Sequence, residues 1–170
     1  MTKTLCKLFV ESATRFPDRQ AIIQGESSIS YQRLSAWAAS IETYLRNNGL
    51  RQGDRVGILL QNTAEYVAIY YGILAAGGVV VSLNTATRAR DLTNWLMHSE
   101  VSWLFAEASH AEFEATLQSI PAAINVVEVG DSASNSAVSQ HINLAVILAD
   151  DHGQLKNPET IRDTDLAAII

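Results

Sequence analysis

Apolar side chains recur every three or four residues in two stretches near the start of the chain, the spacing of amphipathic helices. The first stretch covers residues 4–16 and is stopped by Pro17. The second follows Ser30, a helix-capping residue, and ends at Asn48-Gly49, where glycine accepts the left-handed conformation. The apolar stripe of this second predicted helix consists of Leu34, Trp37, Ala38, Ile41 and Leu45.

From Gly53 onward, short apolar runs alternate with longer helical stretches. The pattern predicts a hairpin over 20–24 and 27–30, strands over 55–60, 79–83, 101–106 and 125–129, and helices over 63–76, 91–98 and 111–120. Residues 142–149 fit a strand or a helix, and 166–170 begin another apolar run. Such alternation favours a parallel sheet. The predicted fold class is α/β, a doubly wound, mainly parallel sheet with helices on both faces, in a single domain over 1–170.

One uncharged stretch, residues 66–87, is long enough to span a bilayer. Gly77-Gly78 interrupts it, and its last third is polar, with Ser82, Asn84, Thr85 and Thr87. A buried helix, a glycine turn and a buried strand explain this pattern better. The apolar run 8–10 is too short for a signal peptide. We therefore expect no transmembrane segment.

The charge balance restricts the class of partner. The 170 residues include 12 Lys and Arg against 18 Asp and Glu, a net charge of −6, and 48% are apolar. Clustered cations, which a nucleic-acid partner requires, are missing from this sequence, so we expect no nucleic-acid binding. The single cysteine, Cys6, cannot form an internal disulfide, which favours a cytoplasmic protein.

Searches for catalytic and metal chemistry find few candidates. No GxxxxGK[ST] or GxGxxG phosphate loop occurs, and Gly77-Gly78, which precedes a strand, is predicted to be a helix stop. The four histidines, His98, His110, His141 and His152, lack metal-ligand spacing. We expect Asp150-Asp151-His152 to be a solvated turn, and Cys6, Trp37 and Trp95 to be core residues. The sequence predicts no catalytic residue and no metal site.

Three segments, in this order along the chain, resemble those of a known enzyme superfamily. ISYQRL at 29–34, GDRVGILLQN at 53–62 and LAAGGVVVSLN at 74–84 are similar to its (I/L)(S/T)YxxL, GDRVxxLLPN and LxAGxVxVPLN segments. The resemblance is to the adenylate-forming enzymes, the AMP-dependent synthetase/ligase superfamily, and it covers nearly the whole chain. Gln61, Ser82 and Thr85 replace residues that are commonly proline there. The implied fold is that of the family's N-terminal subdomain.

The same resemblance sets the expected extent of the chain. DLAAII at 165–170 resembles the strand that leads into the family's Ser/Thr/Gly-rich phosphate loop. We therefore expect an N-terminal fragment that ends just before this loop, with the family's ATP-binding residues and catalytic lysine further downstream. The resemblance implies that ATP, Mg²⁺ and CoA serve the full-length parent, and that this chain alone is inactive and binds none of them.

The segment after Gly78 distinguishes two branches of the superfamily. Residues 80–84, VVSLN, are followed by no Tyr-Pro, and so resemble acyl- or aryl-CoA synthetases rather than peptide-synthetase adenylation domains. The parent is thus expected to activate a fatty or aromatic carboxylic acid as an acyl adenylate and to transfer the acyl group to CoA. Some CoA ligases place an arginine after the Leu-Asn pair, which makes Arg88 and Arg90 candidates for contact with a CoA phosphate.

Two other functions remain open from the sequence. One is a stand-alone, non-catalytic interaction module that retains this subdomain. The other is a flavodoxin-like nucleotide binder that shares only the fold. For the fragment itself we expect self-association, because an apolar face and a strand edge over residues 166–170 would be left uncovered.

Overall fold

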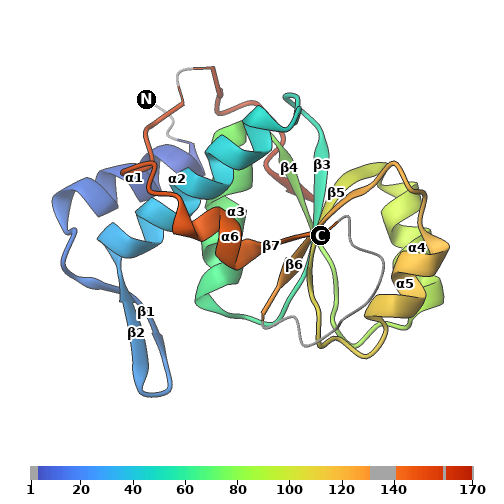
Figure 1. Cartoon of the computed structure of the whole chain (residues 1–170). Coiled ribbons are helices and arrows are strands. Elements are labelled where there is room, and N and C mark those ends of the chain that lie inside the picture. Colours follow the sequence, from blue (N-terminus) through green and yellow to red (C-terminus); the bar gives the residue numbers. More distant parts are fainter. Residues whose placement is uncertain (1–3, 131–140, 159, 170) are drawn as a thin grey trace.

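The computed structural model describes residues 4–130, 141–158 and 160–169, which contain a six-stranded sheet of parallel strands (Figure 1). The strand order is β7-β6-β5-β3-β4-β8, and every neighbouring pair is parallel. The strands are β3 (Arg55–Leu59), β4 (Val79–Ser82), β5 (Val101–Glu107), β6 (Asn125–Val129), β7 (Ile142–Asn143) and β8 (Ala168–Ile169). A separate antiparallel hairpin pairs β1 (Gln20–Gln24) with β2 (Ser27–Ser30).

Helices cover both faces of this sheet. They are α1 (Leu5–Arg15), α2 (Tyr31–Asn47), α3 (Ala64–Ala76), α4 (Ala89–His98), α5 (Phe113–Ser119) and α6 (Leu144–Ala149). The first three and α6 pack on one face, and α4 and α5 pack on the other (Figure 1). The doubly wound α/β fold expected from the sequence is confirmed.

The strands alternate their side chains between two apolar layers. In β3, Val56 and Ile58 join the layer under α2 and α3, whereas Leu59 joins the layer under α4 and α5. In β5, Phe105 lies in the layer under α2 and α3, and Leu104 lies in the layer under α4 and α5. Both side chains are fully buried. Central strands buried on both faces read as continuous apolar runs, which is how they were identifiable in the sequence.

Local signals set the ends of the helices, among them the predicted N-cap Ser30 and the predicted helix stop at Gly77. The hydroxyls of Thr4, Ser30 and Thr63 each accept a hydrogen bond from a backbone N–H in the first turn of α1, α2 and α3. Gly77 ends α3 with φ of +93°, a left-handed conformation in which a side chain would be strained. The uncharged stretch 66–87 is thus a buried helix, a glycine turn and a strand. No helix within the described ranges has the length and apolar character needed to cross a membrane.

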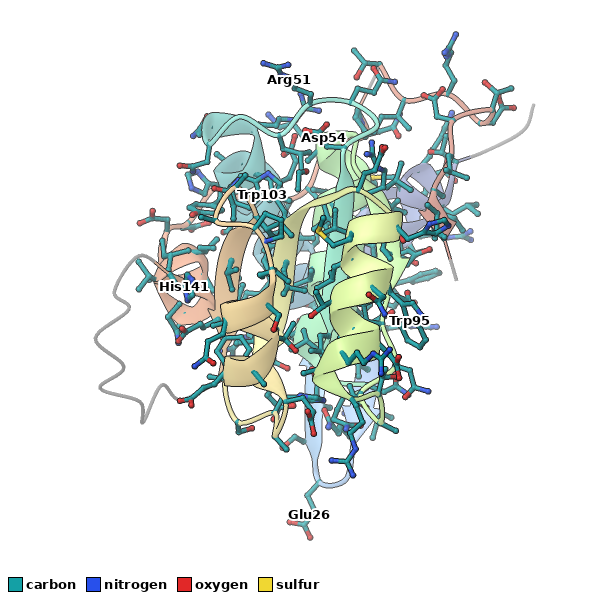
Figure 2. All side chains as sticks on the ribbon, turned by 90° about the vertical axis from the view of Figure 1, so that its right-hand side faces the viewer. Glu26, Arg51, Asp54, Trp95, Trp103 and His141 are labelled. Carbon is teal, nitrogen blue, oxygen red and sulfur yellow. The ribbon has the colours of Figure 1, made fainter. Side chains whose placement is uncertain are left out.

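The structure resolves one open assignment and corrects two expectations. Residues 142–149 were ambiguous between strand and helix, and they form both, β7 and then α6. Trp95 is not a core residue: it is 45% exposed and projects from α4 (Figure 2). The reason is that α4 buries Leu92 and Leu96, and a residue next to Leu96 points well away from that face. Trp37 is only partly buried, beneath the Arg33 guanidinium.

Candidate functional site

The polar edge of the sheet at the carboxyl ends of its strands is the candidate site. From β3 the chain crosses through α3 to β4 on one side, whereas from β5 it crosses through α5 to β6 on the other side. Open α/β sheets bind ligands outside such a reversal, because the two connections leave a crevice between them. The corresponding region here, which we call the crevice, lies between residues 60–63, 83–88 and 108–112, which follow β3, β4 and β5.

Side chains from the neighbouring strand ends hold the segment after β4 in place. Gln61 Nε2 donates to Thr85 Oγ1 at 3.1 Å, and His110 Nε2 lies 2.8 Å from the Thr85 carbonyl oxygen. His110 Nδ1 accepts the Glu112 backbone N–H at 3.2 Å. Because Nδ1 accepts, Nε2 must carry the proton that is donated to Thr85. The geometry therefore places the donor at Nε2 and the acceptor at Nδ1 of His110.

An ion pair between Arg88 and Glu112 lies at the start of helix α4. Glu112 Oε1 accepts from Arg88 Nη1 at 2.9 Å, and Glu112 Oε2 accepts from the Ala89 backbone N–H at 3.1 Å. Arg88 is the N-cap residue of α4, and its own side chain makes no capping bond. The Ala89 backbone bond, followed by the Arg88 hydrogen bond, holds the pKa of Glu112 below its ordinary value. Glu112 is therefore ionised at neutral pH.

The two predicted arginines differ in their surroundings. Arg88 is bound to Glu112, whereas the Arg90 side chain is exposed and makes no hydrogen bond or ion pair with the described part of the chain. Both lie at the start of α4, where the partial positive charge of the helix favours an anion. This arrangement is suited to electrostatic contact with a phosphate. At this edge Ser109 Oγ donates to Glu107 Oε1 at 2.8 Å, an exposed pair of residues two positions apart at the end of β5.

The other candidates from the sequence have structural roles. Gly77-Gly78 lies at the amino end of β4, away from the crevice. The Asp151 carboxylate accepts the Gly153 N–H at 2.8 Å, which makes 151–153 the expected exposed turn. Cys6 is buried, and burial together with Glu42 raises the pKa of its thiol to about 11, so it is not a nucleophile at neutral pH. The described residues contain no group of three metal-binding side chains.

A cavity of about 430 Å³ lies at the opposite, amino edge of the sheet. It is bordered by the starts of β3, β4 and β8, and Gln52 Nε2 donates to Asp165 Oδ2 at 3.1 Å there. Asp54, which precedes β3, accepts the Arg51 backbone N–H at 2.8 Å at this same end (Figure 2). Ligands of open α/β sheets bind at the other edge, so we do not assign this cavity to the candidate site.

Sequence reasoning missed His110, Glu112 and Thr85. Each of them follows a predicted strand within a few residues, and that position was the one available signal. Their partners come from a different strand–helix connection, 24 or 25 residues away, so no local pattern relates them.

These features define an open, doubly wound α/β domain with a cationic segment at the reversal of its strand order. The chain belongs to the AMP-binding enzyme family, whose model matches residues 9–170. Its fold is that of the N-terminal subdomain of adenylate-forming enzymes.

Similar proteins include CoA ligases and peptide synthetases. The chain is 37% identical over 100 residues to a long-chain-fatty-acid–CoA ligase of Bacillus subtilis, covering 59% of this chain and 18% of that ligase. It is 27% identical over 152 residues to bacitracin synthase 3 of Bacillus licheniformis, covering 86% of this chain and 2% of that protein. The anthranilate CoA ligase AuaEII in complex with anthranoyl-AMP superposes with a TM-score of 0.84 at 16% identity, covering 96% of this chain and 31% of that one. The chain thus spans less than a fifth of the curated relatives named here.

Proposed function

We propose that this chain is the N-terminal portion of a longer AMP-forming acyl- or aryl-CoA ligase. The observation that carries the proposal is the family match over residues 9–170, combined with the small part of the Bacillus subtilis ligase that the matching segment spans. The full enzyme would activate a carboxylic acid with ATP, release pyrophosphate, and transfer the acyl group from AMP to the thiol of CoA. Its partners are the carboxylic acid and CoA.

The residues of this chain do not fit a complete ATP site. A phosphate cradle needs a glycine-rich loop with a nearby cation, and the three lysines are Lys3, Lys7 and Lys156. Lys7 lies on α1 and Lys156 lies in the segment before β8, neither of them at the carboxyl-edge crevice. We therefore assign ATP and Mg²⁺ binding to the rest of the enzyme, and we expect residues 1–170 alone to be inactive and to bind no cofactor.

The contribution we propose for this chain is an electrostatic contact with CoA. Arg88 is 83% exposed despite its bond to Glu112, and the neighbouring Arg90 is exposed as well. Guanidinium groups at a helix start suit a phosphate, because their donors match phosphate oxygens in geometry and charge. We propose that these arginines contact a phosphate of CoA.

The test of this function is thioester formation by the longer ligase. The full enzyme is expected to form acyl-CoA from ATP, CoA and a fatty or aromatic acid. Arg88→Ala and Arg90→Ala should each raise the KM for CoA and leave the KM for ATP unchanged, with Arg15→Ala on α1 as a matched control. No thioester with any fatty or aromatic acid would contradict the proposed function. Equal KM values for CoA in all variants would contradict only the arginine assignment.

Two further properties belong to the same proposal. Self-association of the isolated chain is supported by the exposed side chains of Leu5 and Leu166, which border the same cavity, and by Ile169 on β8. Sedimentation over a concentration series tests it, and a monomer at high micromolar concentration would contradict it. A cytoplasmic location is supported by the single, buried Cys6, which has no need of an oxidising compartment.

A further inference from the structure

Glu112 connects two parts of the carboxyl edge that are separate in sequence. It precedes α5, yet its carboxylate accepts from Ala89, the first residue of α4, and from Arg88. A helix start needs an acceptor for its unpaired N–H groups, and a side chain at the N-cap position usually supplies it. In α4 this acceptor comes from Glu112 instead.

The carboxylate is anchored more firmly than the guanidinium that it binds. The Glu112 side chain is 22% exposed, against 83% for Arg88, and one of its oxygens is bound to backbone. Two residues earlier, His110 holds the carbonyl of Thr85 at 2.8 Å. Residues 110–112 therefore hold the segment between β4 and α4 at Thr85, near its middle, and at the start of α4.

We propose that Glu112 is a positioning residue for Arg88, fixing the first turn of α4 and thereby the place of the guanidinium group at the crevice. As far as the ligand is concerned, this rests on the proposed function, which assigns Arg88 to a CoA phosphate. A side chain that is already held loses less conformational freedom when it meets its ligand. Loss of Glu112 should therefore weaken CoA binding, even though it removes a negative charge from the site.

The first test needs no ligand and uses the 170-residue chain. Amide hydrogen exchange is measured by NMR in wild type, Glu112→Ala and Glu114→Ala, the last being an exposed glutamate on α5 that undergoes the same truncation and change of charge. Exchange at Ala89 should rise about fivefold in Glu112→Ala, the factor that corresponds to a lost helix-capping bond. It should stay unchanged in Glu114→Ala. Unchanged exchange at Ala89 in Glu112→Ala would overturn the proposal.

The second test is a double-mutant cycle on the KM for CoA in the longer ligase. Glu112→Gln and Arg88→Ala should each raise this KM about two- to fivefold, as expected for a partly exposed ion pair. The double variant should rise no further than the larger single effect, since Glu112 acts through Arg88. Additive effects of the two substitutions on the KM for CoA, or a lower KM for CoA in Glu112→Gln, would overturn the proposal. If Arg88→Ala leaves the KM for CoA unchanged while exchange at Ala89 rises in Glu112→Ala, the CoA assignment fails and the positioning of α4 stands.

Discussion

The hydroxyl oxygen of Ser35, on α2, accepts a hydrogen bond from the backbone N–H of Leu155 at 3.0 Å, although the two residues are 120 positions apart. Both residues are buried. Further along the same helix, Ser40 Oγ donates to the carbonyl of Asp150 at 2.7 Å. The two serines bind the segment that leads toward β8 onto a helix that otherwise buries apolar side chains. They therefore fix the route by which the chain returns to the sheet.

Replacing Ser35 should cost more stability than replacing Ser40. Ser35→Ala leaves the buried Leu155 N–H without its acceptor, and an unsatisfied buried donor costs about 1–3 kcal/mol. Ser40→Ala removes a hydroxyl from the carbonyl of exposed Asp150, which water can reach, and should cost about 0.5–1.5 kcal/mol. Urea unfolding measures both, with the exposed Ser119→Ala as control. An equal or smaller loss for Ser35→Ala would contradict this account of the return segment.

Gly72 permits the close packing of α2 on α3. A Cβ at this position would lie 2.7 Å from Ile41 Cγ2, 2.8 Å from Ile41 Cβ and 3.0 Å from the Ala38 carbonyl oxygen. Alanine gains about 1 kcal/mol in helix propensity over glycine. Overpacking costs about 1–3 kcal/mol, and here the clash includes backbone, so we expect Gly72→Ala to be destabilising overall.

The control for Gly72→Ala is the double variant with Ile41→Ala. Removing the Ile41 methyl groups relieves the closest contact, so the combined loss should be smaller than the sum of the two single losses. Stability equal to or above wild type in Gly72→Ala would show that the helices can separate without cost.

Burial of Cys6 makes the free energy of unfolding depend on pH in the alkaline range. The pKa of this thiol is raised from 9.0 to about 11, with burial as the main cause and Glu42 as the second. Between these values the folded state keeps a proton that the unfolded chain has released, so the free energy of unfolding falls as pH rises from about 9 to 11. Cys6→Ala should show a shallower decline, the remainder coming from tyrosines. Parallel pH profiles for the two proteins would contradict the burial of this thiol.

Glu100 is held in an uncommon backbone conformation by its place between α4 and β5. It has φ of +50°, and its carboxylate bonds to Arg55 Nη2 at 2.6 Å. Both Glu100→Ala and Glu100→Gly lose this exposed ion pair, but glycine alone also relieves the left-handed strain. We expect Glu100→Gly to be about 1 kcal/mol more stable than Glu100→Ala in urea unfolding. The reverse order would contradict the backbone assignment at this position.

Much of the fold was predictable because its signals are local. Gly77 marks the end of α3, Ser30 marks the start of α2, and uninterrupted apolar runs mark strands buried on both faces. Residues 142–149 could not be assigned, since a two-residue strand followed by a short helix gives no clear period. Trp95 was placed wrongly because its apolar character was taken to indicate burial, whereas Leu92 and Leu96 are the residues that α4 buries.

The candidate site was predictable only in part. Arg88 and Arg90 were identified through the family segment that precedes them, and the CoA contact remains a prediction. Glu112 and His110 could not be identified, because their role depends on the strand order β5-β3-β4, which brings two separate connections to one edge of the sheet. Strand order is a long-range property, and the sequence pattern of a single segment does not contain it.

The most direct test of the central claim is carboxylic-acid-dependent exchange of pyrophosphate into ATP, measured for residues 1–170 alone and for the longer ligase. The account predicts exchange by the longer enzyme with a fatty or aromatic acid. It predicts none by the isolated chain, because the loop amides, the lysine and the Mg²⁺ that stabilise phosphoryl charge would come from the rest of the protein. Robust exchange by residues 1–170, purified free of other ligases, or no exchange by the longer enzyme with any carboxylic acid, would contradict it.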